Sequence, residues 1–254
     1  MQEQQIINTL SDFQSISLSE MDEVKLMNRM DTKFAFSASR FLDILDKLKA
    51  DYRVFEIEGT RMPSYESLYF DDSTFSSFHD HHKGKMSRFK IRIRKYVESN
   101  LHFLEVKHKF KGRTNKTRIS ANGFNKLLDQ SQKEFIQFRT NDLQELNPYL
   151  WNSFNRITLV NIQLQERLTL DLNISFKWEK SIQTFDNLVI AELKQDSLNR
   201  NSPFFTLMKQ LQIRPYRLSK YCIGTIEMHS DKDIKFNRFK KKLLTLKKIN
   251  ENAA

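Results

Sequence analysis

The chain has little cysteine, little glycine and no long apolar run, and each shortage excludes a class of protein. Its single cysteine, Cys222, rules out an internal disulfide framework and a cysteine-rich zinc site, which fits a reducing compartment such as the cytoplasm. Only five glycines are present, and neither a GxGxxG nor a Walker A pattern occurs, so a glycine-rich phosphate loop is not expected. Without a run of about 18 apolar residues or a signal-peptide pattern, we expect a chain that is neither membrane-spanning nor secreted.

Positive charge is abundant. The 254 residues include 42 Lys plus Arg against 31 Asp plus Glu, which gives a net charge of +11. Such a balance favours nucleic acid, an anionic membrane surface or a phosphate-rich ligand as a partner. The hydrophobic content of 39% allows a sizeable core, so the chain is expected to be globular. Charge alone does not choose among the three partners.

The segment 87–97, SRFKIRIRKYV, alternates cations with apolar residues. In an extended strand this alternation puts four cations on one face, Arg88, Lys90, Arg92 and Arg94. Like charges about 7 Å apart repel one another, so such a row is expected where a polyanion lies against it. The row therefore indicates a surface that binds phosphate.

Strand patterns outnumber helical patterns along the chain, without a strand–helix–strand rhythm. Strand character is found at 29–37, 52–57, 65–71, 89–97, 101–110, 114–120, 153–161, 165–178 and 188–195. Helical spacing is found at 41–48, 123–150, from Pro203, at 219–228 and in the basic tail after 232. We therefore expect an α+β fold with a large antiparallel sheet, in which an N-terminal lead-in (1–24) and a basic C-terminal helix or tail (229–254) flank one domain (25–228).

Each of these strands offers one charged and one apolar face. Charges this numerous cannot point into a dry core, so they face either open solvent, as on a nucleic-acid platform, or the wet lumen of a barrel. Glu105, Asp171 and Glu192 lie within the cationic faces, where they would repel a nucleic-acid backbone but could hold Mg²⁺ or Mn²⁺ against phosphate oxygens. The alternative is that they pair with neighbouring Lys and Arg. Stacking aromatics look sparse on the charged faces, which disfavours a nucleic-acid platform.

Short motifs spread over this region resemble one family. RMDTKF, SLYFDD, KIRIRKY, EVK, KTR, RLTLD, AELK and SKY occur in the order seen in the VTC domain, the catalytic domain of the vacuolar transporter chaperone polyphosphate polymerase and a member of the triphosphate tunnel metalloenzymes. The resemblance covers about residues 25–228. It implies an antiparallel β-barrel that forms a cationic tunnel, with helices packed around it, for a nucleoside triphosphate and a growing polyphosphate.

The resemblance also implies roles for individual residues. It assigns a catalytic, phosphate-gripping role to Arg92, Arg94, Lys107, Arg156, Arg167 and Lys220. It assigns phosphate binding to Lys33, Lys90, Lys116, Arg118, Lys194 and Arg217, the last standing where the family has a lysine. Glu192 would hold the divalent metal, Mn²⁺ or Mg²⁺.

The function implied is an ATP-dependent polyphosphate polymerase that passes the γ-phosphate of ATP to the chain end without a covalent protein intermediate. Joining two polyanions requires charge neutralisation, positioning and metal bridging, which a ring of cations plus one metal supplies. ATP and inorganic polyphosphate would be its partners, and delivery across a membrane would need a membrane-protein partner. Two alternatives stay open: hydrolysis of inorganic or nucleoside triphosphate in the same tunnel, and a non-catalytic module that binds polyphosphate or nucleic acid.

Two further features attract functional hypotheses. His79, His81 and His82 are interpreted as an exposed loop rather than a metal site, because adjacent histidines point in different directions. The tail after Lys232 carries apolar residues at helical spacing among many lysines. It is interpreted as a docked helix, with binding to an anionic membrane or to polyphosphate as the alternative.

Overall fold

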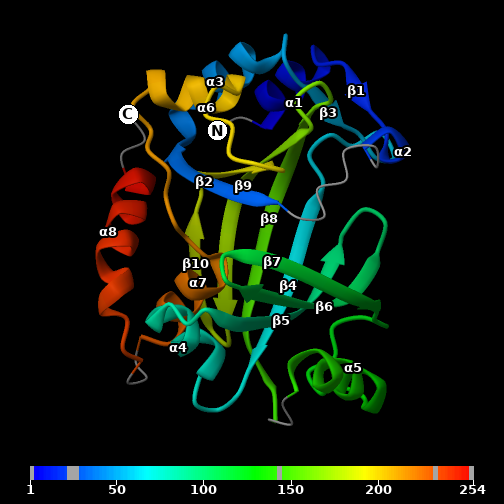
Figure 1. Ribbon diagram of the computed structural model, residues 1–254, viewed down its shortest axis with the longest axis vertical. Helices are drawn as coiled ribbons and strands as arrows, with labels where there is room; N and C mark the ends of the chain where they lie inside the picture. The colour runs from blue at the N-terminus through cyan, green and yellow to red at the C-terminus, as the bar shows by residue number, and fades with distance from the viewer. Residues whose placement is uncertain (1–2, 22–28, 142–144, 231–233, 252–254) are drawn as a thin grey trace.

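A computed structural model describes residues 3–21, 29–141, 145–230 and 234–251 (Figure 1). Its centre is one large sheet in the order β2-β11-β9-β8-β4-β5-β6-β7, in which every neighbouring pair is antiparallel. These strands are β2 (Met30–Ser37), β4 (Ser64–Asp71), β5 (Ser87–Tyr96), β6 (Leu101–Phe110), β7 (Arg113–Ser120), β8 (Asn147–Asn161), β9 (Glu166–Trp178) and β11 (Leu188–Gln195). Short strands β1 (Ser15–Ile16), β3 (Arg53–Phe55) and β10 (Ser181–Phe185) extend the sheet.

The sheet curls into a half-barrel. In Figure 1 the long strands β4 and β8 run down the molecule and β9 runs beside β8, while β2 crosses near the upper end and β5, β6 and β7 cross lower down. In β5, Ile91 and Ile93 are buried on one face, while the cations alternate onto the other face. The α+β class and the antiparallel sheet are therefore as the sequence predicts, because period-two patterning fixes which residues share a face.

Helices cover the apolar surfaces of the sheet. They are α1 (Glu3–Ser11), α2 (Leu18–Met21), the 3₁₀ helix η1 (Ala38–Arg40), α3 (Phe41–Leu48), α4 (Ser76–Lys83), α5 (Gln130–Thr140), α6 (Pro203–Gln210), α7 (Lys220–Met228) and α8 (Asn237–Glu251). The helices α1, α3 and α6 gather at one end of the molecule (Figure 1), where they share a core with β2. Helices α7 and α8 pack on a second core that includes Phe176 and Phe185, and α5 packs on the back of β5 and β6. The described residues include no helix long and apolar enough to cross a membrane.

Two sequence expectations were wrong in their local structure. The helix expected over 123–150 is limited to α5, because Asp129 and Gln132 form a capping box at its start and Asn141 ends it in the left-handed conformation with a φ of 54°. The histidine segment is not a loop but helix α4, which ends at Gly84 with a φ of 76°. Carboxylates of Asp71 and Asp72 accept the first backbone N–H groups of α4 and so fix its start. Residues 22–28, which span the expected boundary between the lead-in (1–24) and the domain (25–228), lie outside the described residues.

Candidate functional site

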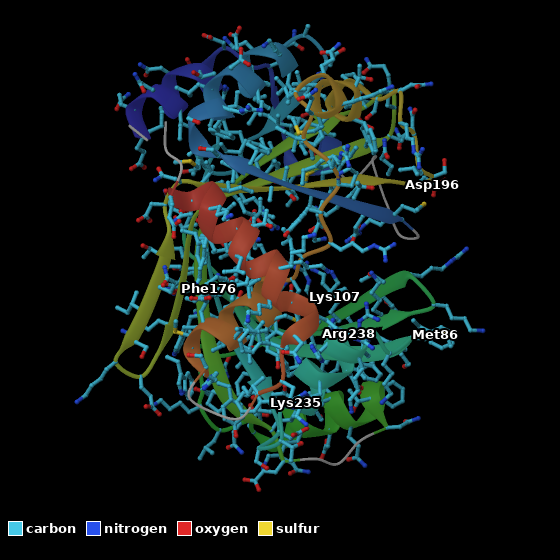
Figure 2. All side chains as sticks on the ribbon, turned by 90° about the vertical axis from the view of Figure 1, so that its left-hand side faces the viewer. Met86, Lys107, Phe176, Asp196, Lys235 and Arg238 are labelled. Carbon is cyan, nitrogen blue, oxygen red and sulfur yellow. The ribbon has the colours of Figure 1, made fainter. Side chains whose placement is uncertain are left out.

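The charged residues predicted on separate strands line one concave face of the curled sheet, which we call the trough. Register places Lys90, Lys107 and Lys116 side by side on β5, β6 and β7. On the other side of the trough, Lys33 lies opposite Glu192, and Lys194 lies opposite Arg167. Figure 2 labels Lys107 near the middle of the molecule, between β2 above and β5 to β7 below. Strands that are distant in sequence therefore bring their cations to one surface.

Glu105 is the centre of one charged cluster in the trough. Arg92 donates from Nε and Nη2 to Glu105 Oε2 at 2.9 and 2.7 Å, and Lys116 donates to Oε1 at 3.1 Å. Arg92 also donates to the hydroxyl of Tyr69 at 2.9 Å. Burial opposes the charge on Glu105, but these cations outweigh burial and hold its pKa well below the usual range. Glu105 thus fixes two cations in place.

Asp171, on β9, is the centre of a second charged cluster. Arg156 donates to both of its carboxylate oxygens, at 2.6 and 2.8 Å, and Lys220 from the first residue of α7 also donates to it. The pKa of Asp171 is lowered despite burial, because the charges of Arg156 and Lys220 outweigh the desolvation. The first residue of α7 is thereby fixed to β9 in the trough.

The Ser-Lys-Tyr motif explains why α7 begins at that position. The Ser219 hydroxyl caps the helix by accepting the N–H of Cys222, and it also accepts a hydrogen bond from Lys90 Nζ at 2.7 Å. Tyr221 donates its hydroxyl to the buried carboxylate of Asp71, at the end of β4. Three consecutive residues therefore cap a helix, place a cation and anchor the helix to the sheet.

Lysines along the trough have lowered pKa values, Lys109 and Lys116 among them. Desolvation, the largest cause for each, lowers the pKa of Lys90 and Lys194 to about 7 and that of Lys107 and Lys220 to about 8. Neighbouring cations add to the effect; Lys33, for example, lowers the pKa of both Lys90 and Lys107. Burial and neighbouring cations therefore disfavour the charged form of these lysines, and a bound polyanion would favour it.

The remaining predicted residues differ in their surroundings. Arg94 is buried and donates to Ser67 Oγ at 3.3 Å, and Arg167 donates to the carbonyl of Met21 at 3.2 Å. Arg118 is exposed at the rim on β7. Arg217 is exposed in the segment before α7, and it is among the cations that add to burial in lowering the pKa of Lys109. The structure thus brings most of the set together and leaves Arg118 and Arg217 at the margin.

Aromatic residues on the trough face are the feature that the sequence reading missed. Tyr65, Tyr69, Tyr96, Phe103 and Phe154 lie among the cations, with Arg92 over Tyr69 and Lys220 over Phe154 at 5.6 and 4.4 Å from the ring centroids. The sequence did contain a signal for this. Tyr96 lies two positions after Arg94, and Phe103 lies two positions before Glu105, so each aromatic shares a strand face with a charged residue. The expectation that aromatics are sparse on the charged faces was therefore wrong.

Glu192 is the carboxylate best suited to a divalent metal. It is paired with Lys33 at 2.8 Å, and Lys194 lies 4.0 Å away, but no arginine in the described part of the chain forms a salt bridge with it. Its side chain is 17% exposed. The described part of the chain contains no group of three or more His, Cys, Asp or Glu side chains placed for a metal ion. Since Mg²⁺ is commonly bound by one or two carboxylates plus substrate phosphates, Glu192 fits such an ion when phosphate supplies the other oxygens.

The histidines do not form a metal site with Asp80. His81 Nδ1 accepts a hydrogen bond from Arg88 Nε at 3.1 Å, and burial together with nearby cations lowers its pKa far below the usual value. Asp80 instead forms a salt bridge with Lys85 at 2.9 Å. The neutral His81 ring therefore supports Arg88 at the start of β5.

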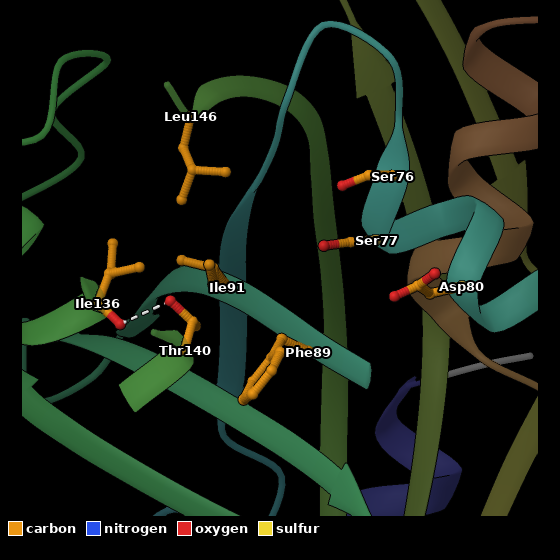
Figure 3. A pocket seen from close by; sticks show the side chains of 8 residues that line it. All are labelled: Ser76, Ser77, Asp80, Phe89, Ile91, Ile136, Thr140 and Leu146. Carbon is orange, nitrogen blue, oxygen red and sulfur yellow. Dashed lines mark hydrogen bonds between the residues drawn. The ribbon is translucent and has the colours of Figure 1, made fainter. Parts of the chain in front are cut away.

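A separate hollow of about 70 Å³, partly open to solvent, lies on the back of β5 (Figure 3). Its lining residues come from α4, β5, α5 and the approach to β8, and they are Ser76, Ser77, Asp80, Phe89, Ile91, Ile136, Thr140 and Leu146. Phe89 and Ile91 alternate with the trough cations along β5, so this hollow and the trough lie on opposite faces of one strand. None of the predicted site residues lines it.

Comparison with known proteins gives one family. The model of the VTC domain matches residues 28–229. No curated protein matches the chain. Among solved structures, a putative adenylate cyclase from Vibrio parahaemolyticus is 10% identical, with 75% of this chain and 94% of that chain covered and a TM-score of 0.46. A putative adenylyl cyclase from Hippeastrum, with a dominant triphosphatase activity, is 12% identical, with 83% and 99% covered and a TM-score of 0.44. Likenesses this distant carry no argument about activity.

Proposed function

Because the chain belongs to the VTC domain family, we propose that it is a polyphosphate polymerase that transfers the γ-phosphate of ATP to a growing inorganic polyphosphate chain. The observation that carries this proposal is the pairing of Lys90 with Lys107. These half-buried lysines are neighbours across β5 and β6, and neither forms a salt bridge within the described part of the chain. Phosphate oxygens would supply the negative charge that both lack.

In the proposed reaction, an oxygen of the terminal phosphate of the acceptor attacks the γ-phosphorus of ATP. The bond between that phosphorus and the β–γ bridging oxygen breaks, which leaves ADP and a chain one phosphate longer. The attacking oxygen is already ionised, so the step requires no strong general base. The cations of the trough hold the two polyanions in line and neutralise their repulsion.

The proposed roles follow the surroundings of each side chain. In this proposal, phosphate is contacted by Lys33, Lys90, Lys107 and Lys116. Arg92 stays paired with Glu105 and Arg156 with Asp171, and both direct their remaining N–H groups into the trough. Glu192 would hold a Mn²⁺ or Mg²⁺ ion, which neutralises phosphate charge when bound. A cytoplasmic location belongs to the proposal, because ATP is supplied there and Cys222 is a free, buried thiol. Delivery of polymer across a membrane would require a partner membrane protein.

The test is product analysis with the purified chain, ATP and Mn²⁺ or Mg²⁺, followed by ³¹P NMR. Formation of ADP together with phosphate polymer, abolished by a chelator, is the expected result. Release of orthophosphate without polymer would replace the proposal by triphosphate hydrolysis. ATP that is bound but left intact with either metal would indicate a non-catalytic binding module.

A further inference from the structure

The two ends of the trough differ in composition. At one end, which we call the aromatic end, Tyr65, Tyr96, Phe103 and Phe154 share the trough face. The ring centroids of Tyr65 and Tyr96 are 5.1 Å apart, those of Tyr65 and Phe154 are 5.5 Å apart, and those of Tyr96 and Phe103 are 5.8 Å apart. Tyr65 and Phe154 are buried, whereas Tyr96 and Phe103 are half-buried. The first two therefore support the second two, which face the opening.

Arg118 completes the aromatic end. Its guanidinium lies over the ring of Phe103, 4.3 Å from the centroid, and its Nη1 is 3.5 Å from the hydroxyl of Tyr96. Arg118 is exposed, so the Phe103 ring covers one face of the guanidinium and leaves the other open. A flat guanidinium held in this way offers a surface for stacking with another π-system.

The other end of the trough has a different character. Beyond Glu105 the trough residues of β5 and β6 are Lys90, Arg88, Lys107 and Lys109, and Lys33 approaches from β2. Lys107 lies four positions after Phe103 along the extended strand, a distance of about 13 Å at about 3.3 Å per residue. That distance suits a molecule with a flat ring at one end and several phosphates at the other.

We propose that the aromatic end binds the nucleobase of the nucleoside triphosphate, so that its phosphates run toward Lys107 and the γ-phosphate lies farthest from Phe103. This inference rests on the proposed function and adds a direction to it. Inorganic polyphosphate has no apolar surface, so aromatic side chains at the opening give it nothing to bind. A nucleobase stacks on Arg118 and on the edge of the Phe103 and Tyr96 pair whatever its hydrogen-bonding pattern. The acceptor chain then lies at the cationic end, and ADP leaves past the aromatic end.

The inference gives Arg118 a role other than phosphate binding. Stacking on a nucleobase requires the planar guanidinium, whereas binding a phosphate requires a positive charge and N–H donors. Lysine preserves the charge and loses the plane. Arg118→Lys therefore separates the two roles, and Phe103→Ala removes the support beneath Arg118.

The experiment is calorimetric titration of the full chain with ATP and with tripolyphosphate, both in a chelator so that no metal-dependent turnover occurs. Arg118→Lys and Phe103→Ala should each raise the Kd for ATP at least about fivefold and leave the Kd for tripolyphosphate within about twofold. Phe138→Ala is the matched control, because Phe138 is 74% exposed on α5 with Arg139 5.1 Å from its ring centroid, outside the trough.

The possible outcomes are distinct. If Arg118→Lys weakens both ligands equally, or weakens neither, the base-binding role is overturned while triphosphate binding in the trough stands. If the unaltered chain binds neither ATP nor tripolyphosphate, the proposed function itself fails. Loss of the folded signal in Phe103→Ala, seen by circular dichroism, leaves Arg118→Lys to decide between these outcomes.

Discussion

The carboxylates of the trough fall into two kinds. Glu105 and Asp171 are each held by an arginine and a lysine, and their side chains are 1% and 3% exposed. Among the described residues, Glu192 is paired only with lysines, and its side chain is 17% exposed. A guanidinium that donates two hydrogen bonds fixes a carboxylate more firmly than a lysine does. The first kind therefore fixes the cations that line the trough, and we propose that the second exchanges its lysine partner for a metal ion.

The largest loss of stability is expected when the carboxylate of Asp171 is removed. Asp171→Asn removes a carboxylate that is 3% exposed and leaves Arg156 and Lys220 without their counter-charge, which should lower the free energy of unfolding by about 3–5 kcal/mol. Urea denaturation followed by circular dichroism measures this change. Asp43→Asn is the matched control, since Asp43 pairs with Lys47 at the surface and its loss should cost less than about 1 kcal/mol. Equal losses in the two variants would contradict a structural role for Asp171.

A smaller effect, on binding rather than folding, is expected at Lys107. Lys107→Met removes a cation whose pKa is lowered by burial and which has no salt bridge within the described residues, so stability should stay the same or rise. The affinity for tripolyphosphate should fall by about tenfold to a hundredfold, because a charge-assisted hydrogen bond is lost. Calorimetry compares this variant with Lys177→Met, which alters an exposed lysine of β9. Unchanged affinity in Lys107→Met would remove Lys107 from the phosphate site.

The pH dependence of polyanion binding tests whether the trough lysines, unlike the carboxylates of Glu105 and Asp171, act in binding rather than in folding. Burial lowers the pKa of Lys90 to about 7, so the side chain is protonated below pH 7 and becomes neutral above it in the free protein. A bound polyanion favours the ammonium form, so binding should take up a proton at Lys90, and this lysine alone should lower the affinity by up to about tenfold per pH unit above pH 7. Titrations at pH 8 in two buffers of different ionisation enthalpy measure the uptake. Lys90→Met should flatten this dependence, and an unchanged slope would count against Lys90.

The sequence predicts the faces of the strands well because side-chain alternation is local. Arg92 and Glu105 are each placed on the charged side by their immediate neighbours alone. Their ion pair depends on the register between β5 and β6, which one strand does not encode. For the same reason, motifs alone could not predict the contact of Lys220 with Asp171. Nor could they predict the aromatic end, which joins residues of β4, β5, β6 and β8. The helix α4 was missed because its start is set by the side chains of Asp71 and Asp72 rather than by apolar spacing.

Glu192 tests the distinction between the two kinds of carboxylate most directly. Glu192→Gln should change the free energy of unfolding by less than about 1 kcal/mol, the smallest of these effects, because the Glu192 carboxylate is 17% exposed and its ion pairs within the described residues are to lysines. The decisive measurement is the Kd for tripolyphosphate with and without Mn²⁺ in this variant and in the unaltered chain. We expect metal-free binding to be retained in Glu192→Gln and the strengthening by Mn²⁺ to be lost. Strengthening by Mn²⁺ that persists in Glu192→Gln would contradict the assignment of Glu192 as the metal ligand.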